Sequence, residues 1–203
     1  MQKKLTNTVK NEIIYVVSTQ WSECMRVITG EARGRKLITL EGDDVRPTTD
    51  RVKESIFNII QFDVEGASVL DLFAGSGQLG IEALSRGAKH CTFVDSSNRS
   101  IEVVKQNLKT VGFEKRASVF CGDGKMYITL SHDRFDIAFL DPPYNKQIID
   151  SVLPAVAEKM TDYGVILCES ELREELPETA GEFTKHREYK YGKIKVTAYR
   201  KNK

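Results

Sequence analysis

Residues 69–80 read VLDLFAGSGQLG, and this stretch decides the fold. An apolar run that contains Asp71 passes directly into a loop with three glycines, Gly75, Gly77 and Gly80. Their spacing fits the pattern G-x-G-x-x-G, which follows the first strand of nucleotide-binding βαβ units. Glycine lets the backbone adopt positive φ and approach a bound ligand closely. The stretch therefore predicts a strand, a ligand-binding loop and the start of a helix.

From Ser68 onward, short apolar runs alternate with amphipathic segments. We expect strands at 69–73, 91–95, 117–121, 136–140 and 165–168. We expect helices at 78–86, 99–111, 125–130 and 147–160. This alternation predicts βαβ units and a parallel sheet. The segments 183–191 and 193–200 flank Gly192 and predict an antiparallel hairpin. The expected fold is α/β and Rossmann-like, with a mostly parallel seven-stranded sheet that ends in an antiparallel C-terminal hairpin.

The chain divides into three expected parts. Residues 1–24 are polar and precede the coherent pattern, so we interpret them as a small N-terminal extension, either a mobile arm or the result of an upstream start codon. Residues 25–62 carry a basic segment around Gly34 and a helix with apolar residues at helical spacing. Residues 63–203 form the α/β domain.

Composition limits the classes of function. The 203 residues include 30 basic and 29 acidic side chains, so a nucleic-acid surface must be local. The four cysteines form no CxxC pair, so we expect no metal site. We expect a cytoplasmic protein with reduced thiols. Cys91, Cys121 and Cys168 lie in strand-like runs, where we expect them to be buried. No apolar run reaches membrane length, and we expect no membrane partner. We further expect a monomer.

Acids stand at the ends of three expected strands. Asp71 lies within the first, Asp95 ends the second before Ser96, and Asp123 follows the third before Gly124. Carboxyl ends of parallel strands meet at one edge of a sheet, where ligands bind. Singly, each acid fits a helix N-cap or turn residue. Together they predict a cofactor site formed by Asp71, Phe73, Gly75, Ser76, Gly77, Asp95, Ser96, Asp123 and Gly124.

Two cofactors fit the glycine loop. An acid at the second strand tip can accept both ribose hydroxyls of either NAD or S-adenosylmethionine. Asp71 inside the first strand and Asp123, placed to accept from an adenine amine, favour S-adenosylmethionine. No Lys-Ser/Thr pair follows the glycines, so a phosphate-binding P-loop is excluded.

The motif Asp141-Pro142-Pro143-Tyr144 closes the apolar run 135–140. Proline lacks the N–H of a central strand, so the strand ends there. The Asp141 carboxylate and the Pro142 carbonyl suit the two hydrogens of an exocyclic amine, while the Tyr144 ring suits stacking on its base. The motif also fits a strand terminator with a turn. We interpret these four residues as the catalytic set.

With these residues in place, the chain resembles the RsmD family of bacterial small-subunit rRNA guanine-N2 methyltransferases from Met25 to about Arg200. The matching segments are 26–30 with 33–35, 46–54, 71–77, 82–88 and 141–144. The resemblance implies a class I S-adenosylmethionine-dependent methyltransferase. It implies methyl transfer to the exocyclic N2 of one guanine in small-subunit ribosomal RNA, within a partly assembled subunit.

The two N-terminal segments are the specific part of the resemblance, which implies that residues 25–62 contact the RNA. The candidate substrate contacts are Arg33, Arg35, Arg46, Thr49 and Arg51. Basic residues there are dispersed among acids, and a solvated surface is the alternative. The tail from Thr184 is more strongly basic and fits either a phosphate-contact face or protection of a sheet edge. Gln78 and Gly124 depart from the family, which often has a small or apolar residue and alanine there.

Three other functions remain as alternatives. A DNA adenine-N6 methyltransferase shares the Asp-Pro-Pro-Tyr chemistry, but this chain has no room for a target-recognition insert. An NAD-dependent oxidoreductase fits the glycine loop but lacks a proton-donor set. A non-catalytic RNA-binding assembly factor on the same fold is disfavoured by the intact motif at 141–144.

Overall fold

The computed structural model describes residues 25–40, 50–143 and 148–202. Its strands are β1 (Ser68–Asp71), β2 (His90–Asp95), β3 (Ala117–Cys121), β4 (Phe135–Leu140), β5 (Met160–Glu171), β6 (Thr179–Ala180), β7 (Phe183–Tyr191) and β8 (Ile194–Lys201). Its helices are α1 (Asp50–Ile59), α2 (Gln78–Ser85), α3 (Asn98–Val111), α4 (Gly124–Leu130) and α5 (Ile148–Glu158), with a 3₁₀ turn at Glu114–Arg116.

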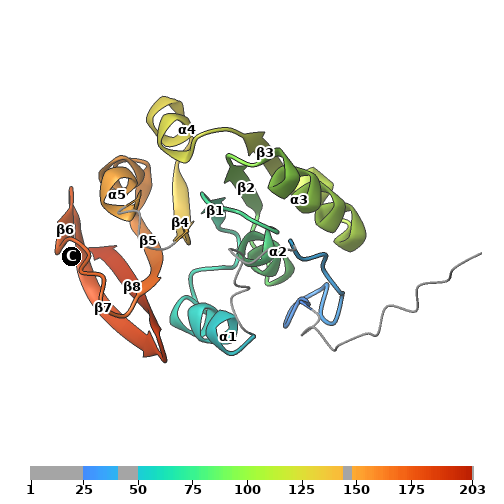
Figure 1. Cartoon of the computed structure of the whole chain (residues 1–203), viewed down its shortest axis with the longest axis horizontal. Helices are drawn as coiled ribbons and strands as arrows, with labels where there is room; N and C mark the ends of the chain where they lie inside the picture. The colour runs from blue at the N-terminus through green and yellow to red at the C-terminus, as the bar shows by residue number, and fades with distance from the viewer. Residues whose placement is uncertain (1–24, 41–49, 144–147, 203) are drawn as a thin grey trace, which may run out of the picture.

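The strands form one sheet in the order β3-β2-β1-β4-β5-β8-β7-β6 (Figure 1). Strands β1 to β5 pair in parallel, while β8, β7 and β6 pair antiparallel. This confirms the predicted α/β fold with its C-terminal hairpin. The sheet has one strand more than predicted, because the two-residue strand β6 adds to β7. A run that short leaves no periodic pattern in the sequence.

The chain order reverses between β1 and β4, which are neighbours in the sheet. From β1 the chain continues outward through β2 and β3, then returns to β4 on the other side of β1. Open α/β sheets bind ligands outside the carboxyl ends of the strands at such a switch point. The topology therefore places the candidate site where the loops after β1 and β4 meet.

Two hydrophobic layers cover the sheet. Helices α1, α2 and α3 pack on one face, against residues such as Phe93, Phe139 and Val196. Helices α4 and α5 pack on the other face, against residues such as Leu140 and Tyr199 (Figure 1). None of the helices in the described part of the chain is long and apolar enough to cross a membrane.

The segment 25–40 packs against the same core as the sheet. Its apolar side chains Met25, Val27, Ala32 and Leu37 are buried with those of α1 and α2. Backbone bonds fold the segment back on itself, with Val27 N–H donating to Arg35 O and Leu37 N–H to Met25 O. We call residues 25–37 the N-terminal loop. It lies beside α2, and Figure 1 draws it in blue.

Two of the three strand cysteines are buried as predicted, and one is not. Cys91 and Cys168 are buried, and burial raises the pKa of both thiols. Cys121 is exposed because β3 is the edge strand of the sheet, so its side chains have a neighbour on one side alone. The prediction for Cys121 was therefore wrong.

Candidate active site

The glycine loop joins β1 to α2 through a left-handed turn. Gly75 and Gly77 have φ values of 54° and 78°, a region that strains other residues. Gly77 N–H donates to Ala74 O at 2.6 Å, which closes the turn. Gly80 serves packing: an added Cβ would lie 2.3 Å from Phe93 Cε1, so the helix can approach β2 this closely only without a side chain. The three glycines thus bring α2 to the carboxyl edge of the sheet.

Asp71 lies beneath this loop, where it is 2% exposed. Its Oδ2 accepts a hydrogen bond from Gly80 N–H at 3.0 Å, which fixes the first turn of α2. Burial raises the pKa of Asp71 to about 7, against the opposing effect of the Gly80 bond and with a smaller contribution from the nearby Asp95 charge. Its position indicates that Asp71 supports the loop from below.

Asp95 links the tip of β2 to the glycine loop. Its Oδ2 accepts from Gly75 N–H at 2.9 Å, and its Oδ1 accepts from Ser97 N–H at 2.8 Å. Each carboxylate oxygen has further lone pairs, and Asp95 is partly exposed beside the exposed Ser96. The structure brings the Asp95 carboxylate to the edge of the loop that was expected to hold the cofactor.

Asp123 caps the N-terminus of α4, which is one of the roles that the sequence predicts for an acid at this kind of position. Its Oδ1 accepts from Met126 N–H at 2.8 Å. Gly124 behind it is buried, and a Cβ there would approach Leu72 Cγ and Phe73 Cε1 to 3.3 and 3.4 Å. The start of α4 therefore packs closely against the loop after β1. An alanine at 124 would require a shift of a few tenths of an ångström.

A cavity of about 300 Å³ adjoins Asp123. Its wall comes from β2, β3 and α4 and is mostly apolar: Val94, Phe120, Met126, Tyr127 and Leu130. Phe120 and Tyr127 contact each other with ring centroids 5.0 Å apart. An apolar slot with a carboxylate beside it suits a planar base that carries an amine.

Asp141 directly follows the last residue of β4, a strand that pairs with β1. The register pairs Asp71 with Phe139, and Leu72 N–H donates to Phe139 O at 3.1 Å. Asp141 lies two residues beyond Phe139, at the carboxyl end of β4 and next to the strand β1. Asp141 is partly exposed, Pro142 is buried and Pro143 is exposed. Tyr144 lies outside the described residues, as do Arg46 and Thr49.

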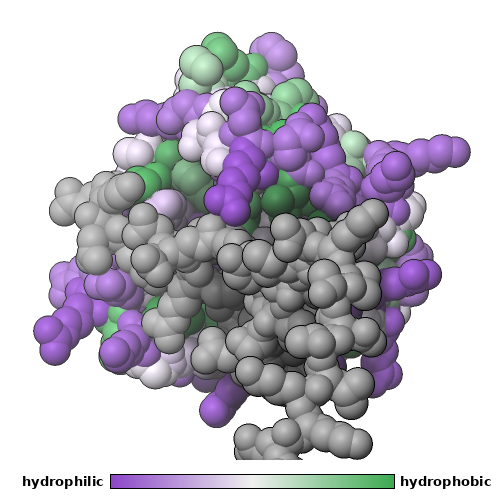
Figure 2. Space-filling view, turned by 45° about the vertical axis from the view of Figure 1, so that its right-hand side comes forward, coloured by the Kyte–Doolittle hydropathy of each residue, from purple (hydrophilic) through white to green (hydrophobic). Residues whose placement is uncertain are grey.

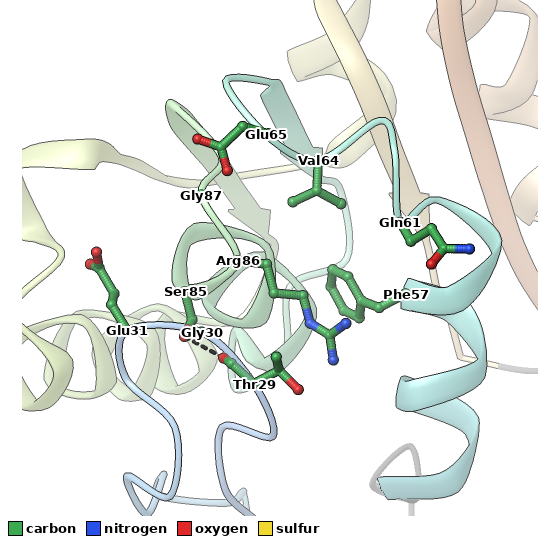
Figure 3. Close-up of a pocket in the computed structure, with 10 residues that line it drawn as sticks. All are labelled: Thr29, Gly30, Glu31, Phe57, Gln61, Val64, Glu65, Ser85, Arg86 and Gly87. Carbon is green, nitrogen blue, oxygen red and sulfur yellow. Dashed lines mark hydrogen bonds between the residues drawn. The ribbon is translucent and has the colours of Figure 1, made fainter.

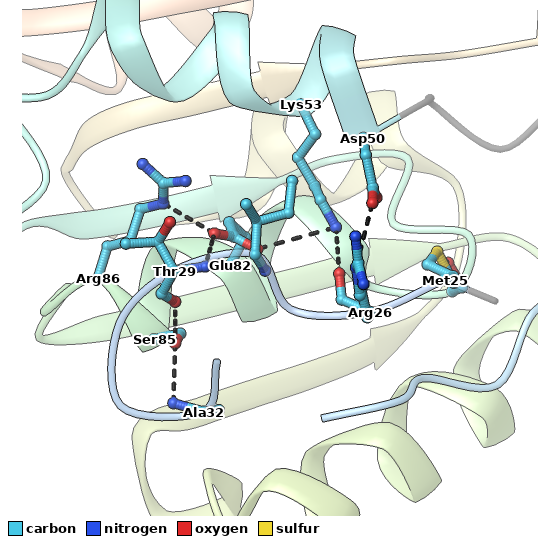
Figure 4. A network of polar contacts seen from close by, with 11 residues as sticks. Met25, Arg26, Thr29, Ala32, Asp50, Lys53, Glu82, Ser85 and Arg86 are labelled. Carbon is cyan, nitrogen blue, oxygen red and sulfur yellow. Dashed lines mark hydrogen bonds and ion pairs between the residues drawn. The ribbon is translucent and has the colours of Figure 1, made fainter. Parts of the chain in front are cut away.

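The N-terminal loop is fastened to α2 by the Glu82 carboxylate (Figure 4). Glu82 accepts from Ile28 N–H at 2.7 Å, from Thr29 N–H at 2.9 Å and from Arg86 Nε at 2.8 Å. Further along, Ser85 Oγ donates to Thr29 O and accepts from Ala32 N–H. Gly30, at φ 86°, makes the approach possible, because a Cβ there would lie 1.7 Å from Ser85 O.

Lys53 completes this network from α1. Its side chain is fully buried, its Nζ donates to Arg26 O at 2.6 Å, and it lies 3.8 Å from Glu82 Oε2. Desolvation lowers the pKa of Lys53, although the Glu82 charge acts in the opposite direction. Lys53 is thus an internal cation and no part of a basic surface. The signal in the sequence was the apolar spacing of α1, which puts residue 53 beside Val52 and Ile56 on the buried face.

Of the candidate RNA-contact residues, two described ones lie in the N-terminal loop and one lies in α1. Arg33, Arg35 and Arg51 are exposed. Met25 lies near the glycine loop, with Ser76 Oγ 3.6 Å from its sulfur. Ala32, which precedes Arg33, is hydrogen-bonded to Ser85 at the C-terminal end of α2. This end lies roughly 12 Å from the start of the eight-residue helix, where the glycine loop is. Figure 2 shows hydrophilic side chains over most of the described surface that it presents, with small hydrophobic patches between them.

Most cations of the C-terminal hairpin have acidic partners. Lys185 pairs with Glu178, Lys195 with Glu188, Arg200 with Asp63, and Lys201 with Asp162 and Glu182. Lys195 is also buried. The strongly basic tail of the sequence therefore presents far less free charge in the fold than its composition indicates.

A larger cavity, of about 390 Å³, lies away from the strand tips (Figure 3). It opens between the N-terminal loop, α1 and the end of α2, and its lining includes Glu31, Phe57, Glu65 and Arg86. The Arg86 guanidinium stacks over the Phe57 ring at 4.5 Å. Acids flank this single arginine, so the cavity has no clear charge preference, and we place the candidate active site at the switch point.

Comparison with known proteins agrees with this geometry. A family model described as "Conserved hypothetical protein 95" matches residues 25–200. The chain is 45% identical over 182 residues to a Bacillus subtilis protein named "Putative rRNA methyltransferase YlbH", covering 87% of this chain and 99% of that protein. It is 32% identical over 179 residues to Escherichia coli "Ribosomal RNA small subunit methyltransferase D", covering 87% and 90%.

Solved structures show the same fold. An Escherichia coli structure described as "Putative methyltransferase yhhF" superposes with a TM-score of 0.79 at 32% identity, covering 88% of this chain and 98% of that one. A structure described as "a putative methyltransferase complexed with SAH" superposes with a TM-score of 0.67 over 82% of this chain and 53% of that one; at 15% identity it shows the fold alone.

The switch-point site and these matches define a methyltransferase with a Rossmann-like fold. More particularly, the chain belongs to the RsmD family, as the match to residues 25–200 shows.

Proposed function

We propose that this protein transfers a methyl group from S-adenosylmethionine to the exocyclic N2 of a guanine in small-subunit ribosomal RNA. The observation that carries the proposal is that Asp141 and Pro142 follow β4, which neighbours β1 at the switch point, while the glycine loop follows β1. Ligands bind where the loops after such neighbouring strands meet, so the amine acceptors after β4 would lie near a loop suited to a nucleoside cofactor. The names of the relatives at 45% and 32% identity support ribosomal RNA as the substrate.

The described residues fit S-adenosylmethionine. Asp95 at the tip of β2 would accept the ribose hydroxyls, and Asp123 beside the apolar cavity would accept the adenine amine. Gly75 and Gly77 leave the loop backbone open to close approach, while Asp71 holds the loop from beneath. Phe73, Ser76, Ser96 and Gly124 complete the proposed cofactor contacts. When bound, this cofactor supplies a methyl group already activated by its sulfonium, so the protein needs no metal for that step.

The protein's own task is to hold a weak nucleophile in line with that methyl group. Orientation of this kind is worth roughly 7–11 kcal/mol in favourable cases. The Asp141 carboxylate and the Pro142 carbonyl would accept the two hydrogens of the guanine amine and stabilise positive charge that develops on nitrogen. Pro143 fixes the turn, and Tyr144 would stack on a base that has left its helix. Water can take the proton that the methylated amine releases.

Ribosomal RNA would reach this site across the N-terminal part. We propose that residues 25–62 contact RNA through Arg33, Arg35, Arg46, Thr49 and Arg51. The exposed arginines at 33, 35 and 51 support this role, since guanidinium groups bind phosphate in a bidentate manner. Arg33 lies at the far end of α2, which suits an RNA that extends beyond the target nucleotide.

The test is methyl transfer from tritiated S-adenosylmethionine to ribosomal RNA or small subunits from cells that lack the enzyme, followed by nucleoside mapping. We expect label in N2-methylguanosine of small-subunit RNA. Label in N6-methyladenine of DNA would support the DNA enzyme instead. Tight binding of the subunit without any transfer would support an assembly factor.

A further inference from the structure

Asn107 is a fully buried polar residue within α3. Asparagine is a weak helix former, and a buried carboxamide needs hydrogen bonds for its polar atoms. Asn107 makes these bonds to the main chain of other segments. Its Oδ1 accepts from Ile38 N–H at 2.7 Å, and its Nδ2 donates to Ile38 O at 3.0 Å and to Ser76 O at 2.9 Å. One side chain therefore joins two segments that are remote from α3 and from each other in the sequence.

The bonds to Ile38 attach the end of the N-terminal loop to α3. Both main-chain groups of Ile38 are bonded to the same carboxamide, so this residue is held from its N–H and from its carbonyl. Ile38 directly follows the N-terminal loop, and the proposed RNA contacts Arg46 and Thr49 come shortly after it in the sequence. Asn107 thus fixes the chain at a point between two groups of proposed RNA contacts.

The bond to Ser76 holds the glycine loop. Ser76 lies between Gly75 and Gly77, and glycine leaves the backbone more conformations than other residues have. Asp95 fixes this loop at Gly75 N–H, and Asn107 fixes it one residue later at Ser76 O. The loop that is proposed to bind the cofactor therefore takes part of its position from α3.

A second contact links the same two parts of the chain. Ser76 Oγ lies 3.6 Å from the Met25 sulfur, and Met25 O accepts from Leu37 N–H at 2.8 Å. The start of the N-terminal loop and the residue that follows its end are thus both connected to the glycine loop. A ligand that orders one of these parts also restricts the other, which lowers the entropy cost of binding a second ligand there.

We propose that Asn107 is a positioning residue that couples RNA binding at the N-terminal part to cofactor binding at the glycine loop. RNA held by the N-terminal part fixes Ile38, Ile38 fixes the Asn107 carboxamide, and the carboxamide fixes Ser76 O. Binding of RNA and cofactor is then cooperative, and each strengthens binding of the other by the same factor. This inference rests on the proposed function and extends it, because methyl transfer itself does not require such coupling.

Equilibrium binding of tritiated S-adenosylhomocysteine tests the coupling, because this compound has no methyl group to transfer. Its affinity is measured for the protein alone and with saturating small subunits from cells that lack the enzyme, and co-sedimentation verifies that the protein is bound to them. We expect subunits to strengthen the binding about fivefold or more in the wild type. Asn107→Ala, which loses all three bonds, should lose most of this gain.

Asn107→Asp and Leu108→Ala complete the comparison. Asn107→Asp keeps an acceptor for Ile38 N–H but has no amide N–H for Ser76 O, so it should also lose most of the gain. Leu108 is a buried apolar neighbour on α3. Its truncation should lower the melting temperature without removing a bond to Ile38 or Ser76, and Leu108→Ala should keep the full gain. If Asn107 only stabilised the fold, the gain would persist in the folded fraction of every variant.

The inference and the proposed function can fail separately. A wild type that methylates subunits but shows no gain in affinity when bound to them would overturn the inference and leave the proposed function intact. The full gain in folded Asn107→Ala or Asn107→Asp would also overturn it. If the wild type bound neither S-adenosylhomocysteine nor subunits, the proposed function would fail together with the inference.

Discussion

Lys53 Nζ lies 3.8 Å from Glu82 Oε2, and both side chains are fully buried. The pair joins α1 to α2 beneath the N-terminal loop. Burial of two charges is costly, and removing one partner leaves the other without compensation, typically at about 3–5 kcal/mol. Here the two partners are not equivalent. Glu82 also accepts from two backbone amides and from Arg86, whereas the remaining bond of Lys53 is to Arg26 O.

We therefore expect Glu82→Gln to destabilise the protein more than Lys53→Met does. The glutamine variant should lose at least about 3 kcal/mol in the free energy of unfolding, because it leaves the Lys53 charge buried. The methionine variant should lose less, because Arg86 still neutralises Glu82. Urea denaturation measures both. Lys105→Met, in an exposed pair with Glu102, should change stability by less than about 0.5 kcal/mol. The reverse order for the two buried residues would contradict this account.

Asp71 should make stability fall as the pH rises. Its pKa is about 7 in the folded protein, raised from 3.8 by burial. The folded state therefore holds this proton more tightly than the unfolded chain does. The stabilisation is complete below pH 4 and is lost between pH 4 and about 7, at roughly 1 kcal/mol per pH unit. Unfolding of Asp71→Asn across this range should lack that contribution. If the difference in the free energy of unfolding between the wild type and Asp71→Asn did not change with pH, Asp71 would be ionised over the whole range.

Asp95→Ala should remove most of the affinity for S-adenosylhomocysteine. The proposed ribose contact to a charged acceptor is worth roughly 1.5–3 kcal/mol, and the variant also releases Gly75 N–H from its present partner. Calorimetry gives the change in the dissociation constant. Glu102→Ala, at an exposed position of α3, serves as the control. An unchanged affinity in Asp95→Ala would reject the assigned role.

Asp141→Ala should abolish or greatly slow methyl transfer while cofactor affinity stays near that of the wild type. The reason is positional, because Asp141 lies beyond β4, on the amine side of the proposed site. Asp141→Asn keeps an acceptor oxygen and removes the charge. The activity that this variant retains therefore shows how much of the rate depends on orienting the amine and how much on the negative charge. Transfer rates on small subunits, with calorimetry in parallel, give both quantities. Near-normal turnover in Asp141→Ala would remove this motif from the mechanism.

The sequence predicted the sheet and the glycine loop because both depend on local patterns. The apolar periodicity of the strands and the glycine spacing after β1 each act within a few residues. It did not predict the burial of Lys53 or the clamp formed by Glu82, since both require the N-terminal loop to reach α2 from more than fifty positions away. The composition of the basic tail did not show which of its cations are paired: Lys195 pairs with Glu188 nearby, whereas Arg200 pairs with Asp63, which is remote in the chain.

Asp123 shows a second reason why the sequence alone did not assign the site. An acid before a helix can cap it or bind a ligand, and sequence alone does not separate the two. The structure shows that Asp123 Oδ1 caps α4, yet an acid that caps a helix can still accept from a ligand through its other oxygen. The residues at 46–49 and Tyr144 lie outside the described chain, so their assignments stay predictions.

The bonds by which Glu82 holds the N-terminal loop go to main-chain amides of Ile28 and Thr29 and depend on no side chain of that loop. Evolution could therefore exchange the outward residues of this segment, Arg33 and Arg35 among them, without weakening its anchorage. If this segment contacts RNA as proposed, its contacts can change while the attachment of the loop to α2 stays the same.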